Sequence, residues 1–269
     1  MANLEPLIQS IPVAPLKLAS LEGCRTLADQ VNNYLVSFRH ESPTNVGQAD
    51  SLQGYCADSY LLECECPRFG SGEGKGVLKE SVRGCDLFIM VDVTNYSLTY
   101  RVNGYENHMS PDNHYQDLKR IISAADGKAR RINVIMPFLY EGRQHKRSKR
   151  ESLDCALMLQ ELVDMGVSNI LTFDAHDPRV SNSIPLHGFD SFMPTYQFLK
   201  ALVNSVPDFV IDNDHLMIIS PDEGAMGRAV YFSNILGVDM GMFYKRRDYS
   251  TVVNGKNPIV AHEFLGDDV

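Results

Sequence analysis

The sequence predicts an α/β protein built on mainly parallel β-sheets. Short apolar runs at residues 132–136 and 170–173 are typical of buried strands. The segments between such runs repeat apolar residues at helical spacing. Strands that alternate with helices indicate βαβ units, whose strands run parallel.

The expected elements of the first half are short. Apolar residues three or four positions apart predict helices around residues 27–35 and 118–122. Compact apolar runs predict strands at 60–62, 86–91 and 132–136, and Pro137 ends the last of them because proline cannot donate to a ladder.

The second half continues the alternation. We expect helices over residues 153–163, around 198–203 and after Pro221, and Gly166 closes the first of them. We expect strands at 170–173, 216–220 and 238–244. The first set of units ends near residue 192, so the predicted domains are 1–192 and 193–269.

Composition narrows the class of protein. Of the 269 residues 44% are hydrophobic, and the formal net charge is −9. An acidic chain lacks the basic footprint of a general nucleic-acid or anionic-membrane binder. No apolar run approaches the roughly 20 residues that span a bilayer, and the N-terminus does not resemble a secretory signal. We expect a cytoplasmic protein that binds neither nucleic acid nor membrane.

The six cysteines are too sparse for a disulfide scaffold in a chain of this length. Cys64 and Cys66 form a C-x-C pair, but no further pair or histidine cluster completes a zinc pattern. We interpret them as two half-buried thiols on one face of a strand. A reducing compartment fits this usage.

A basic segment follows the strand at 132–136. Residues 143–150 hold five Arg or Lys residues, together with Gln144 and His145. Arginine offers a planar fork for phosphate oxygens and lysine offers a compact charge. A solvated loop is the alternative, but ligands bind beyond the carboxyl ends of parallel strands, which favours an anion site.

Three further segments also follow strands. Asp174, His176 and Asp177 could hold a divalent cation and touch a phosphate, or be structural. The turn at residues 220–229 suits a phosphate or hydroxyls, although it lacks the G-x-x-x-x-G-K-[ST] pattern and could be an ordinary turn. Lys245 and Arg247 could clamp a charged transition state or form an exposed basic turn.

Taken together, these segments resemble the ribose-phosphate pyrophosphokinase family. The matching stretches are F-G-S-G-E at 69–73 with S-V-R-G at 81–84, P-F-L-Y-E-G-R-Q at 137–144, D-A-H at 174–176, S-P-D-E-G at 220–224 and K-R-R at 245–247. Each match is modest, but their order and spacing are specific. The resemblance implies two phosphoribosyltransferase-like α/β domains with mainly parallel sheets, of which the second is incomplete here.

The resemblance also implies a reaction. The family transfers the diphosphoryl group of ATP to ribose 5-phosphate, requires Mg²⁺, and forms dimers that assemble into hexamers. The roles carried over by position are adenine binding by Phe69, Ser71 and Glu73 from a neighbouring subunit, ATP binding by Arg143, Gln144 and Lys146, phosphate and metal contact by His176, ribose or metal contact by Asp222 with Gly224, and stabilisation of the transferring group by Lys245 and Arg247.

The sequence departs from the family at several places. His145 replaces an aspartate, Ala225 replaces a glycine, and residues 177–184 differ from a segment linked to regulation. The D-D-x-x-x-T/S-G-x-T/S loop that binds the 5-phosphate is missing. Asp267 and Asp268 are not that loop, because we expect no apolar strand before them. We therefore expect either a chain truncated at its C-terminus or a protein that lacks half of its acceptor site.

Two alternatives remain open. A non-catalytic paralogue that regulates or scaffolds active subunits would explain the missing loop, whereas His176, Asp222, Lys245 and Arg247 argue for catalysis. A phosphoribosyltransferase that consumes the sugar diphosphate ranks last, since it too needs the missing loop.

Overall fold

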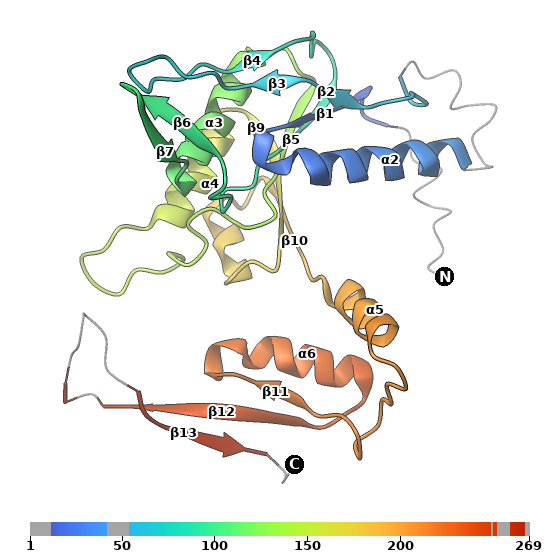
Figure 1. Ribbon diagram of the computed structural model, residues 1–269, viewed down its shortest axis with the longest axis vertical. Coiled ribbons are helices and arrows are strands. Elements are labelled where there is room, and N and C mark those ends of the chain that lie inside the picture. Colours follow the sequence, from blue (N-terminus) through green and yellow to red (C-terminus); the bar gives the residue numbers. More distant parts are fainter. Residues whose placement is uncertain (1–11, 42–53, 249, 252–258, 267–269) are drawn as a thin grey trace. The chain divides into compact units, whose positions relative to one another are not determined.

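The computed structural model describes residues 12–41, 54–248, 250–251 and 259–266 (Figure 1). The chain divides into two compact units, Met1–Met193 and Pro194–Val269. Each unit is described by itself.

The first unit is built on a six-stranded sheet in which every pair of neighbours is parallel, in the order β10-β9-β8-β5-β1-β2. Its strands are β1 (Leu16–Ser20), β2 (Leu61–Leu62), β5 (Asp86–Met90), β8 (Arg131–Ile135), β9 (Val167–Phe173) and β10 (Gly188–Phe192). Its helices are α2 (Arg25–Glu41), α3 (Pro111–Ala124) and α4 (Asp154–Asp164), with short 3₁₀ turns η1 (Glu22–Cys24) and η2 (Pro178–Ser183).

Helices cover both faces of this sheet (Figure 1). Successive side chains of a strand point to opposite faces. Accordingly, Ala19 and Ile89 join the core formed with α3 and α4, whereas Leu18 and Met90 join a smaller core with Ala28 of α2. Burial on both faces explains why the central strands read as continuous apolar runs.

Two antiparallel pairs complete the first unit. β3 (Cys64–Glu65) pairs with β4 (Val77–Leu78), and β6 (Thr99–Val102) pairs with β7 (Tyr105–His108). The turn between β6 and β7 places Asn103 at φ 49° and Gly104 at φ 87°, as a tight hairpin requires. Both thiols are free, as expected, but Cys64 is buried rather than half-buried, and the half-buried Cys66 lies just beyond β3.

The second unit has a sheet in the order β11-β12-β13, in which β11 and β12 are parallel and β12 and β13 antiparallel. Its elements are α5 (Thr195–Ser205), β11 (Ile218–Ser220), η3 (Glu223–Ala225), α6 (Met226–Leu236), β12 (Met240–Arg247) and β13 (Ile259–Leu265). Gly237 ends α6 with φ 69°, in the left-handed region that favours glycine.

The α/β class with a mainly parallel sheet is confirmed. One expectation was wrong: a strand, β13, does precede Asp267, although it is antiparallel to its neighbour and its side chains at 262, 263 and 265 are exposed. Residues 267–269 lie outside the described residues. No described helix is long and apolar enough to cross a membrane.

Candidate nucleotide site

The carboxyl ends of all six strands of the first unit lie at one edge of the sheet, since every pair is parallel. Ligands of open α/β sheets bind outside this edge. The loop after β8 holds Arg143, Gln144 and Lys146, and the loop after β9 holds His176. β8 and β9 are neighbours, so these two loops start side by side.

The loop after β8 folds into turns. Gly142 donates its N–H to Leu139 at 3.0 Å, and Gln144 donates to Glu141 at 2.8 Å, with Glu141 at φ 53°. Burial raises the pKa of Glu141, and the negative charge of Asp154 raises it further. This folding sets Gln144 in place, because its carbonyl accepts the N–H of Cys155 at the start of α4.

The side chains of this loop offer free hydrogen-bonding capacity. Arg143 and Lys146 are exposed, and neither forms a hydrogen bond or ion pair with the described residues. The Oε1 atom of Gln144 is buried and has no partner within the described residues. An unsatisfied buried acceptor costs free energy, so a donor on a ligand would stabilise it.

The loop after β9 is held by its own contacts. Asp174 has φ 42° and donates its N–H to Phe192, while Ala175 donates to Ser191 Oγ at 2.9 Å. Asp177 accepts from the backbone and the guanidinium of Arg179. The hydrogen bonds from the Arg179 side chain hold the pKa of Asp177 far below its usual range. Asp177 is therefore an engaged carboxylate.

His145 joins the two loops. Its ring lies 5.1 Å from the His176 ring, measured between centroids, and its Nε2 lies 3.6 Å from Asp177 Oδ2. Its Nδ1 lies 3.0 Å from the Arg143 carbonyl, and since a carbonyl only accepts, Nδ1 carries a hydrogen. The structure thus brings Arg143 and Gln144 together with His176. The sequence marked His145 only as a departure from the family and missed this contact.

The segment at 69–73 forms a tight loop between β3 and β4. Phe69 donates its N–H to Glu73 at 2.7 Å, and Ser71 Oγ donates to Glu73 Oε2 at 2.8 Å. Phe69 is 54% exposed. Within the described ranges no hydrogen bond or ion pair links this loop to Arg143 or His176. Its action from a neighbouring subunit stays a prediction.

A buried ion-pair network supports this loop, and no sequence pattern predicts it. Asp117 of α3 accepts two hydrogen bonds from Arg68, at 2.7 and 2.8 Å, and one from Arg120 at 2.6 Å. Arg68 also donates to the Cys66 carbonyl at 3.0 Å. These bonds fix the chain at the residue before Phe69.

The remaining predicted residues belong to the second unit. Asp222 accepts the N–H of Ala225 at 3.1 Å and so caps η3, ahead of α6. Gly224 lies in that 3₁₀ turn. Lys245 and Arg247 lie in β12, where they pair with His262 and Ile259 of β13. The side chains of Lys245 and Arg247 fall outside the described residues.

The described residues form no cage for a metal ion. They contain no group of three or more His, Cys, Asp or Glu side chains arranged to hold one. Mg²⁺ prefers oxygen ligands and usually binds through one or two carboxylates together with substrate phosphates. His176 and Asp222 therefore fit Mg²⁺ only as companions of a bound polyphosphate.

Comparison with known proteins identifies the family. A family model for the N-terminal domain of ribose phosphate pyrophosphokinase matches residues 16–166, more than half of the chain. The chain belongs to the ribose-phosphate pyrophosphokinase family. The resemblance noted in the sequence is thereby confirmed.

Curated relatives in this family support the assignment. A ribose-phosphate pyrophosphokinase of Staphylococcus epidermidis is 27% identical over 201 residues, covering 73% of this chain and 56% of the relative. One from Oceanobacillus iheyensis is 26% identical over 202 residues, covering 74% and 57%. This chain thus spans little more than half the length of these relatives.

A solved structure agrees on the fold. The phosphoribosylpyrophosphate synthetase of Mycobacterium smegmatis is 20% identical and matches with a TM-score of 0.66, covering 94% of this chain and 67% of that chain. At this level of identity the match supports the fold of the ribose-phosphate pyrophosphokinase family and leaves the site to be argued from its own residues.

Proposed function

We propose that this chain acts as a ribose-phosphate diphosphokinase and binds ATP at the loops after β8 and β9. In the proposed reaction the anomeric oxygen of ribose 5-phosphate attacks the β-phosphorus of ATP. The bond from that phosphorus to the oxygen bridging the α- and β-phosphates breaks, AMP leaves with the bridging oxygen, and the hydroxyl proton is released. The products are phosphoribosyl pyrophosphate and AMP.

One observation carries the proposal. The loops after β8 and β9 meet through His145 and His176, and the five Arg and Lys side chains of residues 143–150 form no ion pair with the described residues. The chain has 34 Asp and Glu residues against 25 Lys and Arg residues, so carboxylates are not scarce. A cluster of cations that nevertheless stays unpaired at the ligand-binding edge of the sheet favours a polyanionic substrate. A nucleoside triphosphate has the required charge.

The chain's own residues would act by positioning and charge neutralisation, which dominate phosphoryl transfer. Arg143, Gln144 and Lys146 would hold the nucleotide, and His176 would contact its phosphates. Mg²⁺ bound with the nucleotide would neutralise charge on the phosphates.

The other assignments belong to the same proposal. The second unit would supply Asp222 and Gly224 to the ribose, and Lys245 and Arg247 to the transferring group. Phe69, Ser71 and Glu73 would reach adenine in a neighbouring subunit of a homo-oligomer, expected as dimers forming a hexamer in the cytoplasm.

The test measures AMP and phosphoribosyl pyrophosphate formed from MgATP and ribose 5-phosphate by the full natural chain. Arg143→Gln is expected to raise the KM for MgATP about tenfold or more, the usual effect of losing a hydrogen bond to a charged group. Arg130→Gln is the matched control, because Arg130 is also exposed but precedes β8 at the opposite edge of the sheet.

Three results are distinguishable. AMP formation that depends on Arg143 and not on Arg130 supports the proposal. Binding of MgATP without AMP release in the full chain would indicate a non-catalytic regulatory paralogue instead. Absence of MgATP binding, measured by calorimetry, would contradict the nucleotide site itself.

A further inference from the structure

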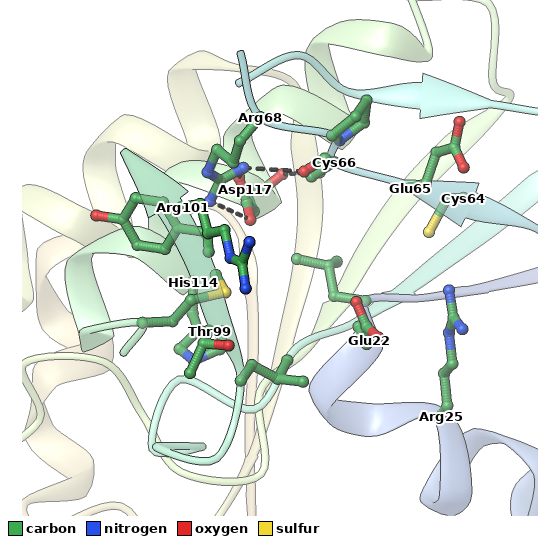
Figure 2. Close-up of a pocket in the computed structure, with 15 residues that line it drawn as sticks. Glu22, Arg25, Cys64, Glu65, Cys66, Arg68, Thr99, Arg101, His114 and Asp117 are labelled. Atoms are coloured by element: carbon green, nitrogen blue, oxygen red, sulfur yellow. Dashed lines mark hydrogen bonds and ion pairs between the residues drawn. The ribbon is translucent and has the colours of Figure 1, made fainter. Parts of the chain in front are cut away.

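A second hollow of the first unit lies apart from the loops after β8 and β9. It has a volume of about 420 Å³ and lies between the start of α2, β3, β6 and the first turns of α3 (Figure 2). Ligand pockets typically measure roughly 300–1,000 Å³. None of the residues that line it belongs to segments 137–150 or 174–177.

The floor of this hollow is apolar. Leu21, Leu98 and Met109 line it together with the thiols of Cys64 and Cys66. Burial raises the pKa of Cys64 to about 11 and that of Cys66 to about 12, so both thiols are uncharged at neutral pH. Such a floor suits the apolar body of a ligand.

Most charges around the hollow are already paired. Asp117 is occupied by Arg68 and Arg120, and Glu65 pairs with Lys79 at 2.6 Å. Because these charged side chains already pair with one another, none of them requires a charged group on a ligand.

Two guanidinium groups remain. Arg25 and Arg101 line the hollow, and neither guanidinium group forms a hydrogen bond or ion pair with any described residue. Figure 2 shows that they come from different elements, the start of α2 and strand β6. Glu22 is the one lining carboxylate without a described partner, so the unpaired charge amounts to two cations against one anion.

We propose that this hollow binds a small organic anion, which Arg25 and Arg101 attract from two sides of the hollow and whose apolar body packs on the floor formed by Leu21, Leu98 and Met109. The proposal does not depend on the nucleotide site. It defines a second ligand site on the same unit.

The test uses 4-fluorophenyl phosphate as the probe, followed by ¹⁹F NMR with the full chain. Saturable binding with a Kd of about 1 mM or tighter is expected. Arg25→Gln and Arg101→Gln should each weaken binding about tenfold, as loss of a charged hydrogen bond does. The neutral analogue 4-fluorobenzyl alcohol should bind far more weakly.

Two further variants keep the test decisive. Glu22→Gln removes the unpaired carboxylate and should tighten binding about threefold, a gain that misfolding cannot produce. Arg130→Gln, at an exposed arginine that does not line the hollow, should leave binding unchanged. The proposal is overturned if the probe does not saturate, if the alcohol binds equally well, or if binding follows Arg143 rather than Arg25 and Arg101.

Discussion

Neutralising Asp117 is expected to destabilise the first unit strongly. This carboxylate is 4% exposed and accepts three hydrogen bonds from Arg68 and Arg120, between 2.6 and 2.8 Å. The side chain of Arg68 is itself only 9% exposed. Asp117→Asn would leave a buried guanidinium without its counter-charge, and breaking a buried pair in this way costs about 3–5 kcal/mol.

The measurement is the free energy of unfolding from urea titration followed by circular dichroism. The matched control is Asp126→Asn, which removes the same charge from the exposed pair with Lys128. Asp126 has φ 51°, which asparagine also tolerates, so only a solvent-screened surface ion pair is lost and the free energy of unfolding should change far less. If the free energy of unfolding falls equally in Asp117→Asn and Asp126→Asn, then burial is not the reason that the Asp117 ion pairs stabilise the unit.

Two other expectations follow from pKa shifts. Burial raises the pKa of Cys64 to about 11 and of Cys66 to about 12, so at pH 8 iodoacetamide should modify the exposed Cys56 well before either of them. Mass spectrometry of the peptides measures the three rates, and equal rates would contradict this expectation. Hydrogen bonds from Arg179 lower the pKa of Asp177 in the folded state, so their stabilisation is present above the unfolded value, about 3.9, and lost as pH falls below it. The stability difference between the natural chain and Arg179→Ala, from urea midpoints at several pH values, should therefore shrink below pH 4; a constant difference would contradict this.

The central strands could be predicted from sequence because both their faces are buried. β5, β8 and β9 lie inside the sheet, so their apolar residues form continuous runs. β1 was not predicted because Lys17 interrupts its run of apolar residues. The ion pair of Lys17 with Glu80 cannot be inferred from the sequence. β10 is an edge strand with mixed polarity, which carries a weak signal.

The β6–β7 hairpin and β13 were missed for a different reason. Every residue of β7 is exposed, so no apolar pattern marks it. The Asn103-Gly104 pair was the available signal, since this dipeptide favours the tight turn of a hairpin. β13 pairs antiparallel with β12 beyond a gap in the described chain, and this pairing could not follow from alternation of strands and helices.

The candidate nucleotide site was only partly open to prediction. Its loops could be located because polar residues follow apolar runs, and the parallel sheet puts them at one edge. The contact of His145 with His176 and Asp177 joins segments some thirty residues apart. It depends on the pairing of β8 with β9 and on the turns after β8, which motifs do not specify.

Unpaired cations carry different meanings in this acidic chain, and their surroundings separate them. The side chain of Arg130 is exposed, has no partner among the described residues, and does not line the hollow near Arg25. Arg143 lies in a run of cations at the carboxyl edge of the sheet, and Arg25 and Arg101 line a hollow with an apolar floor. A lone exposed cation is satisfied by water, whereas several unpaired cations around one hollow or loop attract an anion. Comparing glutamine variants at these four arginines therefore separates a nucleotide site, a second anion site and ordinary surface charge within one protein.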